Sequence, residues 1–141
     1  MLLYLDNSVL NRPFDDQRQP RIWLETLSFS LVLTLIEAGE AKLMRSPIHD
    51  LENGRNPFTL RRRWIEKCLR LAVARIALND SIRSRALALE QAGVKALDAL
   101  HLACAEAAST ERFLTCDDRL IQRYSGRMIV QSPVTFTTNL T

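Results

Sequence analysis

The stretch Gly93–Leu120, GVKALDALHLACAEAASTERFLTCDDRL, decides the fold of this chain. Its first half predicts a helix over Ala96–Ala108 that is apolar nearly all round, and helices of this kind are buried. A short apolar run then predicts a strand over Arg112–Thr115, and two aspartates follow directly after it. Helices that alternate with short buried strands are typical of α/β proteins with a parallel sheet.

One carboxylate, Asp98, lies in the first turn of this otherwise apolar helix. A carboxylate on an apolar surface costs free energy unless another group compensates it, and a metal ion does so where other carboxylates converge. The helix dipole also favours an anion at this place. One turn further along, we expect His101 at the edge of the core or behind the ligands, rather than as a ligand itself.

The rest of the chain repeats the alternation of short apolar runs and helical periodicity, which predicts an α/β fold around a parallel sheet. We expect strands over Met1–Leu5, Ala41–Arg45, Ala74–Leu78, Arg112–Thr115 and Met128–Val130, and helices over Arg21–Ala38, from Pro47 to about Gly54, over Asn56–Ala72, Asn79–Gln91 and Asp118–Tyr124. Residues 11–20 read as a polar loop, and Pro133–Thr141 reads as a tail with β character. Neither a repeat nor a linker divides the sequence, so we expect one domain over residues 1–141.

The composition indicates an ordinary globular protein but says little about its function. The 141 residues are 47% hydrophobic and 25% charged, as in ordinary globular proteins, and the net charge of +3 favours a polyanionic partner no more than it favours simple solubility. Three scattered cysteines fit neither a disulfide framework nor a zinc site, so we expect reduced thiols in the cytoplasm. The N-terminus does not resemble a signal peptide, and no apolar run is long enough for a membrane span.

Four acidic residues lie at or near the carboxyl edge of the predicted sheet. Asp6 follows the first strand, Glu52 lies just beyond the second, Asp117 follows the fourth, and Asp98 begins the helix before it. In a right-handed parallel sheet these positions can face one cleft at the carboxyl edge. Crowded carboxylates repel one another unless a cation joins them, and a set of oxygen ligands favours Mg²⁺ or Mn²⁺. Taken singly, Asp6 could instead be a turn or N-cap residue, and Glu52 could serve the helix dipole.

Such a metal site is suited to phosphoryl transfer, because a bound metal ion activates water and stabilises a leaving oxygen. The sequence contains no Walker A motif, GxGxxG fingerprint or GxSxG elbow. A P-loop nucleotide hydrolase, a dinucleotide-binding protein and an α/β-hydrolase are therefore poor alternatives. The helix Asn56–Ala72 carries a run of basic residues that is either a solvated face or a surface for backbone phosphates.

Three segments resemble the PIN-domain family, which contains the VapC-type toxin ribonucleases. They are YLDNSVLNRPFDD near the N-terminus, SPIHDLENGRNP in the middle, and ALDALHLACAEAASTERFLTCDDRL toward the C-terminus, which is the most specific of the three. The resemblance implies a three-layer α/β/α sandwich with a central, mostly parallel sheet of four to five strands. It also implies a Mg²⁺- or Mn²⁺-dependent endoribonuclease site.

By motif position, the resemblance implies a catalytic and metal-binding set formed by Asp6, Glu52, Asp98 and Asp117. It further implies that Ser8 supports Asp6 and that Asp118 replaces or assists Asp117. Asp50 remains an alternative to Glu52, because two helical residues separated by one position point in different directions. RNA phosphates would meet Arg12, Arg61, Arg62 and Arg63.

We weigh three hypotheses. The first is an endoribonuclease that acts as the toxin of a toxin–antitoxin pair, with RNA as substrate, a cognate antitoxin as partner, and a homodimer formed through the helix around Trp23–Ile36. The second is a non-catalytic PIN-like module that holds RNA or a protein, and metal titration distinguishes it from the first. The third is a structure-specific DNA nuclease with the same metals, which parallel assays on RNA and flapped DNA would separate.

Overall fold

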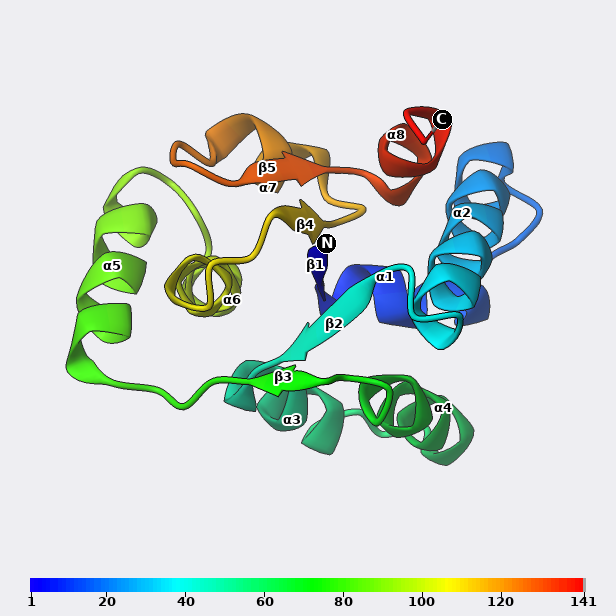
Figure 1. Ribbon diagram of the computed structural model, residues 1–141, viewed down its shortest axis with the longest axis horizontal. Coiled ribbons are helices and arrows are strands. Elements are labelled where there is room, and N and C mark those ends of the chain that lie inside the picture. The colour runs from blue at the N-terminus through cyan, green and yellow to red at the C-terminus, as the bar shows by residue number, and fades with distance from the viewer. Residues whose placement is uncertain (141) are drawn as a thin grey trace.

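The computed structural model describes residues 1–140, and these form a five-stranded parallel sheet with helices on both faces (Figure 1). The strands are β1 (Leu2–Leu5), β2 (Lys42–Arg45), β3 (Ala74–Arg75), β4 (Arg112–Leu114) and β5 (Ile129–Gln131). The helices are α1 (Asn7–Asn11), the 3₁₀ turn η1 (Arg12–Phe14), α2 (Pro20–Glu37), α3 (Pro47–Gly54), α4 (Thr59–Leu69), α5 (Asp80–Gln91), α6 (Ala96–Ala107), α7 (Asp118–Arg123) and α8 (Pro133–Thr138). This confirms the predicted α/β fold.

The order of the strands creates a point where the chain reverses its direction of travel across the sheet. The order is β3-β2-β1-β4-β5, so the chain moves outward from β1 to β3 and returns to pair β4 on the other side of β1. In the middle, Leu3 pairs with Leu43 of β2 on one side and with Arg112 of β4 on the other. Open parallel sheets bind ligands beyond the carboxyl ends of the strands at such a point.

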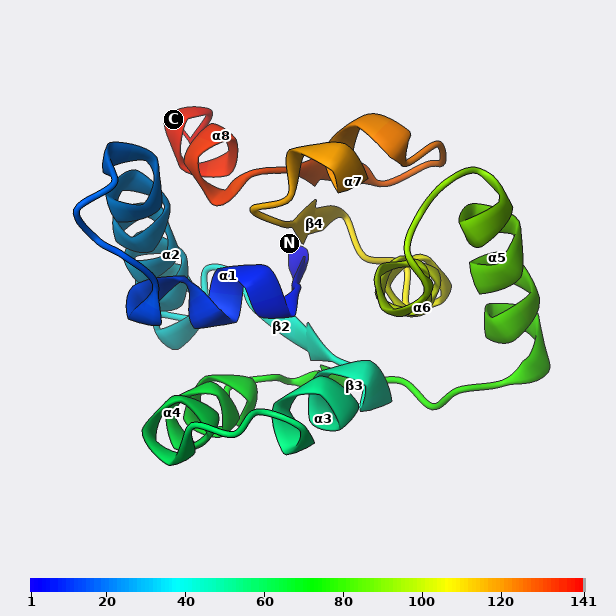
Figure 2. The same cartoon turned by 180° about the vertical axis from the view of Figure 1, so that it is seen from behind.

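Alternating side chains of the central strands enter two separate cores. In β1, Leu3 and Leu5 pack with residues of α1, α2, α4 and α8, whereas Tyr4 packs with residues of α3, α5, α6 and α7. In β4, Leu114 and Phe113 divide between the two cores in the same way. The two views show α2 and α4 on one side of the sheet and α5 and α6 on the other (Figures 1 and 2). These are the three layers that the resemblance implied.

Short polar residues set the starts of the helices at the carboxyl edge of the sheet. The side chain of Asp6 caps α1 by accepting from the Val9 amide, and Asp117 caps α7 in the same way. Ser46 caps α3 directly after β2. Such caps satisfy amides at the start of a helix that lack partners within the helix. The N-cap interpretation of Asp6 is therefore confirmed, and it does not exclude a second role for this carboxylate.

Two local predictions are wrong. Residues 11–20 are not all loop, because α1 ends at Asn11, η1 follows over Arg12–Phe14 and α2 begins at Pro20. The tail with β character is instead the helix α8, which the Ser132 side chain caps and which buries Phe136 against the core. Thr141, the last residue of the predicted tail, lies outside the described residues.

The helix α2 buries a different face from the one that its leucines indicate. Phe29, Val32 and Ile36 are in the core, whereas Trp23 and the leucines at positions 24, 27 and 31 are exposed. The exposed row leaves an apolar strip along the outside of the helix. Within the described part of the chain, no helix has the length and apolarity that crossing a membrane requires.

Candidate active site

The four predicted acids line one cavity of about 320 Å³ at the carboxyl edge of the sheet. Asp6 follows β1, Asp117 lies between β4 and α7, and these two strands are neighbours at the reversal point of the sheet. Glu52 reaches the cavity from α3, and Asp98 reaches it from the first turn of α6. The topology therefore brings together residues that are as far apart as 111 positions in the chain.

Three of the aspartates that line this cavity, Asp6, Asp98 and Asp117, lack the ion pairs that the other aspartates of residues 1–140 have. Asp15, Asp16, Asp50, Asp80 and Asp118 each pair with an arginine. Within residues 1–140, no ion pair is formed by Asp6, Asp98 or Asp117. Three unpaired carboxylates that share a cavity with a fourth form a concentration of negative charge that a cation would stabilise.

Asp6 is the most deeply buried member of the set, with 4% of its surface exposed. Its Oδ1 accepts hydrogen bonds from the Ser8 hydroxyl at 2.5 Å and from the Val9 amide at 3.3 Å. Burial raises the pKa of Asp6, and these hydrogen bonds act in the opposite direction. The Ser8 hydroxyl also accepts from the Cys116 amide at 3.0 Å, so it joins the ends of β1 and β4. Ser8 therefore contacts Asp6 directly.

The pKa of Asp98 shows that the four carboxylates influence one another. This pKa is raised from 3.8 to about 6, first by burial and then by the negative charges of Asp6, Asp117 and Glu52, while His101 acts in the opposite direction. Desolvation and like charges both disfavour the ionised carboxylate. A group with this pKa exchanges its proton close to neutral pH, so a cation that bound at Asp98 would promote release of its proton.

A chain of buried hydrogen bonds fixes Glu52. The Nε2 atom of His101 lies 2.5 Å from the Glu52 carboxylate, and its Nδ1 atom is hydrogen-bonded to the Tyr4 hydroxyl, which also lies 2.6 Å from the Ser46 hydroxyl. With its proton on Nε2, the imidazole donates to Glu52 and accepts from Tyr4. His101 thus supports an acid from behind, as we expected. The run MLLYL gave no indication of this role for Tyr4, although a buried tyrosine hydroxyl normally needs a partner.

Asn7 is a member of the site that the sequence analysis missed. It lines the acidic cavity and is buried, and its Oδ1 atom has no hydrogen-bond partner among residues 1–140. A buried carbonyl oxygen without a partner is costly, so a cation or water that reached this oxygen would remove that cost. Its position directly after Asp6, at the carboxyl end of β1, is the only feature of the sequence that could have identified it.

The chemistry of these residues fits a hard divalent cation. Carboxylate and amide oxygens surround the cavity, while the three cysteines are free and buried and His101 is already bonded on both nitrogens. In the part of the chain that the structure describes, no three acidic, histidine or cysteine side chains stand close enough to form a ready-made metal centre. Binding would therefore require the carboxylates to move toward the cation, which their mutual repulsion opposes only while the cation is absent.

A family model for the PIN domain matches residues 3–126. The chain belongs to the PIN-domain family. The matched range contains all four acids together with Ser8 and His101, and it extends from Leu3 in β1 beyond the end of α7. PIN domains are generally nucleases and typically use divalent metals, so this protein has a nuclease-type fold and belongs with the hydrolases. A search of curated proteins finds no match to the chain.

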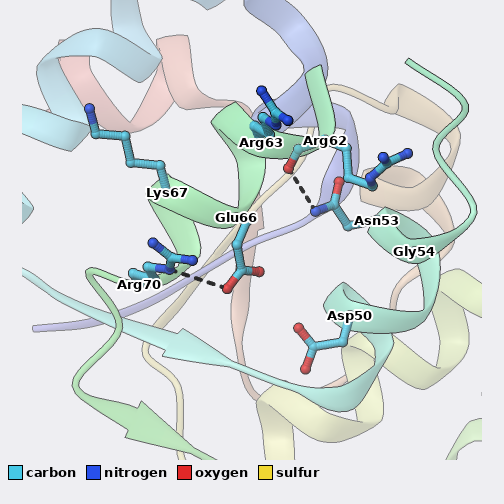
Figure 3. Close-up of a pocket in the computed structure, with 8 residues that line it drawn as sticks. All are labelled: Asp50, Asn53, Gly54, Arg62, Arg63, Glu66, Lys67 and Arg70. Atoms are coloured by element: carbon cyan, nitrogen blue, oxygen red, sulfur yellow. Dashed lines mark hydrogen bonds and ion pairs between the residues drawn. The ribbon is translucent and has the colours of Figure 1, made fainter. Parts of the chain in front are cut away.

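Asp50 and Asp118 lie outside the acidic cavity of this PIN domain. Asp50 pairs with Arg45 at 2.5 Å and lines a separate cavity of about 730 Å³ between α3 and α4 (Figure 3). Asp118 forms a two-pronged pair with Arg21, with both N–O distances at 2.7 Å. Of the two acids of α3, it is therefore Glu52 that faces the other carboxylates. Of the adjacent aspartates after β4, it is Asp117.

The arginines that we expected at RNA divide among three places in the PIN domain. Arg12 lines the acidic cavity but already pairs with Glu25 at 2.8 Å and with Asp15 at 3.1 Å. Arg62 and Arg63 line the cavity between α3 and α4 (Figure 3). Arg61 instead lies over the rings of Phe14 and Phe58. The arginines thus do not form one continuous phosphate-binding row beside the acids.

Proposed function

We propose that this PIN domain is a Mg²⁺- or Mn²⁺-dependent endoribonuclease that hydrolyses RNA phosphodiester bonds. One observation carries the proposal. Every aspartate of residues 1–140 without an ion pair lies in a single cavity, at the reversal point of the sheet, together with Glu52. The family supplies the nuclease class, and the acids supply the place where a metal-assisted hydrolysis would occur.

Asp6, Asp98, Asp117 and Glu52 would hold the metal through carboxylate oxygens. A divalent cation at this place would supply an activated water and would stabilise the charge on the leaving oxygen. The residues of the chain prepare the cavity for it. Ser8 fixes one oxygen of Asp6, and His101 fixes Glu52 through its Nε2–H. Arg12 contributes a positive charge to the wall of the cavity, where a substrate phosphate would lie.

The adjacent pair Asp117 and Asp118 provides a matched experiment. D117N removes one carboxylate and D118N removes the other, and of these two residues only Asp117 lines the acidic cavity. Asparagine caps helices as well as aspartate does, so D117N should leave α7 intact. Cleavage of labelled single-stranded RNA in Mg²⁺ or Mn²⁺ should fall at least about 100-fold in D117N and remain within about twofold in D118N, because the exposed pair with Arg21 contributes little.

Two results would contradict the proposal. The first is cleavage that persists in excess chelator. The second is equal activity of D117N and wild type. Flapped DNA assayed in parallel determines whether the same cavity prefers a DNA substrate, and preferential cleavage of that DNA would replace RNA in the proposal.

The biological setting that we propose is the toxin of a type II toxin–antitoxin pair in the cytoplasm, where the three free cysteines would remain reduced. Expression of the wild-type protein in a bacterial host should then arrest growth, and expression of D117N should not. Growth that continues at equal protein levels would contradict the toxin role while leaving the nuclease proposal to the cleavage assay.

We also propose that the protein pairs with a second copy through α2. Its outer strip, formed by Trp23, Leu24, Leu27 and Leu31, is exposed and apolar, which supports a protein contact there. Light scattering after size-exclusion chromatography should give twice the monomer mass for wild type and the monomer mass for L27E. A monomeric wild type would contradict this proposal.

A further inference from the structure

Two exposed phenylalanines enclose one guanidinium group at the start of α4. The guanidinium carbon of Arg61 lies 5.3 Å from the centre of the Phe14 ring and 4.9 Å from the centre of the Phe58 ring. Phe14 is 37% exposed and Phe58 is 60% exposed, so neither ring is a core residue. We call these three residues the aromatic stack. It combines two partly exposed rings with a positive charge that lies over both of them.

Hydrogen bonds hold the aromatic stack in place, although it is at the surface. The Phe58 amide donates to the Asn56 side chain at 3.1 Å, and Arg62 donates to the Asn56 carbonyl at 2.9 Å. Arg61 donates to the Phe14 carbonyl at 3.3 Å, which connects the start of α4 to η1. A platform fixed in this way loses little conformational entropy when a ligand binds to it.

Residues next to the aromatic stack line the acidic cavity. Phe14 lies between Arg12 and Asp15, and both of these line the cavity. On the other side, the Asn56 side chain reaches Asn11, another residue of the cavity wall, at 3.5 Å. The aromatic stack is thus connected to the cavity wall through Asp15 on one side and through Asn56 and Asn11 on the other.

We propose that the aromatic stack binds an unpaired base of single-stranded RNA, in a nucleotide that lies close to the bond that is cut. This inference rests on the proposed function, because it assumes that a polynucleotide backbone occupies the acidic cavity. Aromatic rings and guanidinium planes are the surfaces on which splayed bases stack, and the charge of Arg61 suits the adjoining phosphates. The bases of a duplex are already stacked on one another, so the aromatic stack selects single strands.

Binding without cleavage tests this inference directly. The probe is a single-stranded RNA hexamer with 2-aminopurine at its centre and randomised flanking bases, titrated with protein in excess chelator. Wild type should quench the fluorescence of 2-aminopurine on binding. F58A should raise Kd by about 5- to 100-fold and reduce the quenching, because stacking on one ring is lost. F58W should retain both, since it restores an aromatic face.

Two comparisons exclude a general loss of structure or charge. L87A removes an exposed apolar side chain of α5, which lies outside the cavity wall and on the other side of the sheet from α4 (Figure 1), and should leave Kd unchanged within about twofold. The slope of log Kd against log salt should be the same for wild type and F58A, because the substitution removes no phosphate contact. A changed slope would assign Phe58 an electrostatic rather than a stacking role and would overturn the inference.

The inference also fails if F58A binds and quenches like wild type, if wild type does not bind the hexamer, or if blunt duplex RNA binds as tightly as the single strand. Its failure can be distinguished from that of the proposed function. If F58A weakens binding but wild type cuts no RNA in Mg²⁺ or Mn²⁺, the nuclease proposal is wrong and the stacking site stands. If wild type cuts RNA but F58A binds and cuts equally well, only the stacking site is wrong.

Discussion

Replacing Asp98 with asparagine should make the metal-free protein more stable and should greatly reduce the stabilisation by metal. The pKa of Asp98 rises from 3.8 to about 6 on folding, first because of burial and then because of the charges on Asp6, Asp117 and Glu52. A folded-state pKa above the unfolded value means that ionised Asp98 opposes folding. The free energy of unfolding therefore decreases as pH rises from about 4 to about 6 and levels off above that range.

The size of this effect follows from the same pKa. A rise from 3.8 to about 6 corresponds to about 3 kcal/mol, and because the side chain is only half-buried, screening by solvent reduces the expected effect to about 1–2 kcal/mol. D98N removes the charge with almost no change in shape. In chelator at pH 8 it should be more stable than wild type by this amount, and at pH 4 the two proteins should differ little.

Urea unfolding followed by tryptophan fluorescence measures both parts of the prediction. Manganese at 100 times its Kd should stabilise wild type by about 2.7 kcal/mol, because a ligand that binds only the folded state shifts the equilibrium by mass action. D98N should gain much less. The reasoning is refuted if D98N is less stable than wild type at pH 8 in chelator. It is also refuted if the stability difference between D98N and wild type in chelator is as large at pH 4 as at pH 8. Equal stabilisation of both proteins by manganese would show that Asp98 does not hold the metal.

Three further predictions follow from the contacts around the site. The Mn²⁺ affinity measured by calorimetry should fall about tenfold per pH unit below pH 6, where Asp98 is protonated. An affinity that does not change between pH 5 and pH 8 would exclude Asp98 as a ligand. Y4F should lower the urea-unfolding free energy by about 1–2 kcal/mol, since it leaves buried His101 and its neighbours short of a partner, and a change under about 0.3 kcal/mol would contradict the hydrogen-bond chain. E25A should lower the free energy of urea unfolding by about 2 kcal/mol. This is less than for a fully buried ion pair, because Arg12 remains paired with Asp15 and is partly exposed to solvent. An unchanged free energy of unfolding would show that the pair between Arg12 and Glu25 does not stabilise the fold.

The sheet and the place of the acids could be predicted because both depend on local pattern. Short apolar runs such as Leu2–Leu5 are buried on both faces in a parallel sheet, and the residue after such a run must lie at its carboxyl edge. Asp6 and Asp117 were located by this argument alone. Asp98 was found because a carboxylate is conspicuous on an apolar helix.

Other features depend on contacts that the sequence does not show. The helix α2 has apolar residues on every side, so its periodicity could not indicate that Phe29 is buried and Leu27 exposed. The helix α1 is too short to show a helical period. In α8 the threonines favour a strand, and the helix forms because it buries Phe136 in the core. Tertiary packing decides all three cases.

The choice between Asp50 and Glu52 needed the rotation of α3 about its axis. Neighbouring residues on a helix differ by about 100°, so two residues separated by one position face nearly opposite sides. The structure turns Glu52 toward His101 and turns Asp50 toward Arg45. A sequence gives the spacing of the two acids but not which of them faces the sheet edge.

The central claim is that the unpaired acids at the sheet edge hold a divalent cation. The most direct measurement is the anomalous diffraction of a crystal soaked with Mn²⁺, compared with a D98N crystal soaked in the same way. We predict a manganese peak in contact with carboxylate oxygens of Asp98 and at least one of Asp6 and Asp117 in the wild type, and none there in D98N. A peak beside Asp50 and Glu66 instead, or no peak at the acidic cavity at saturating Mn²⁺, would contradict the account.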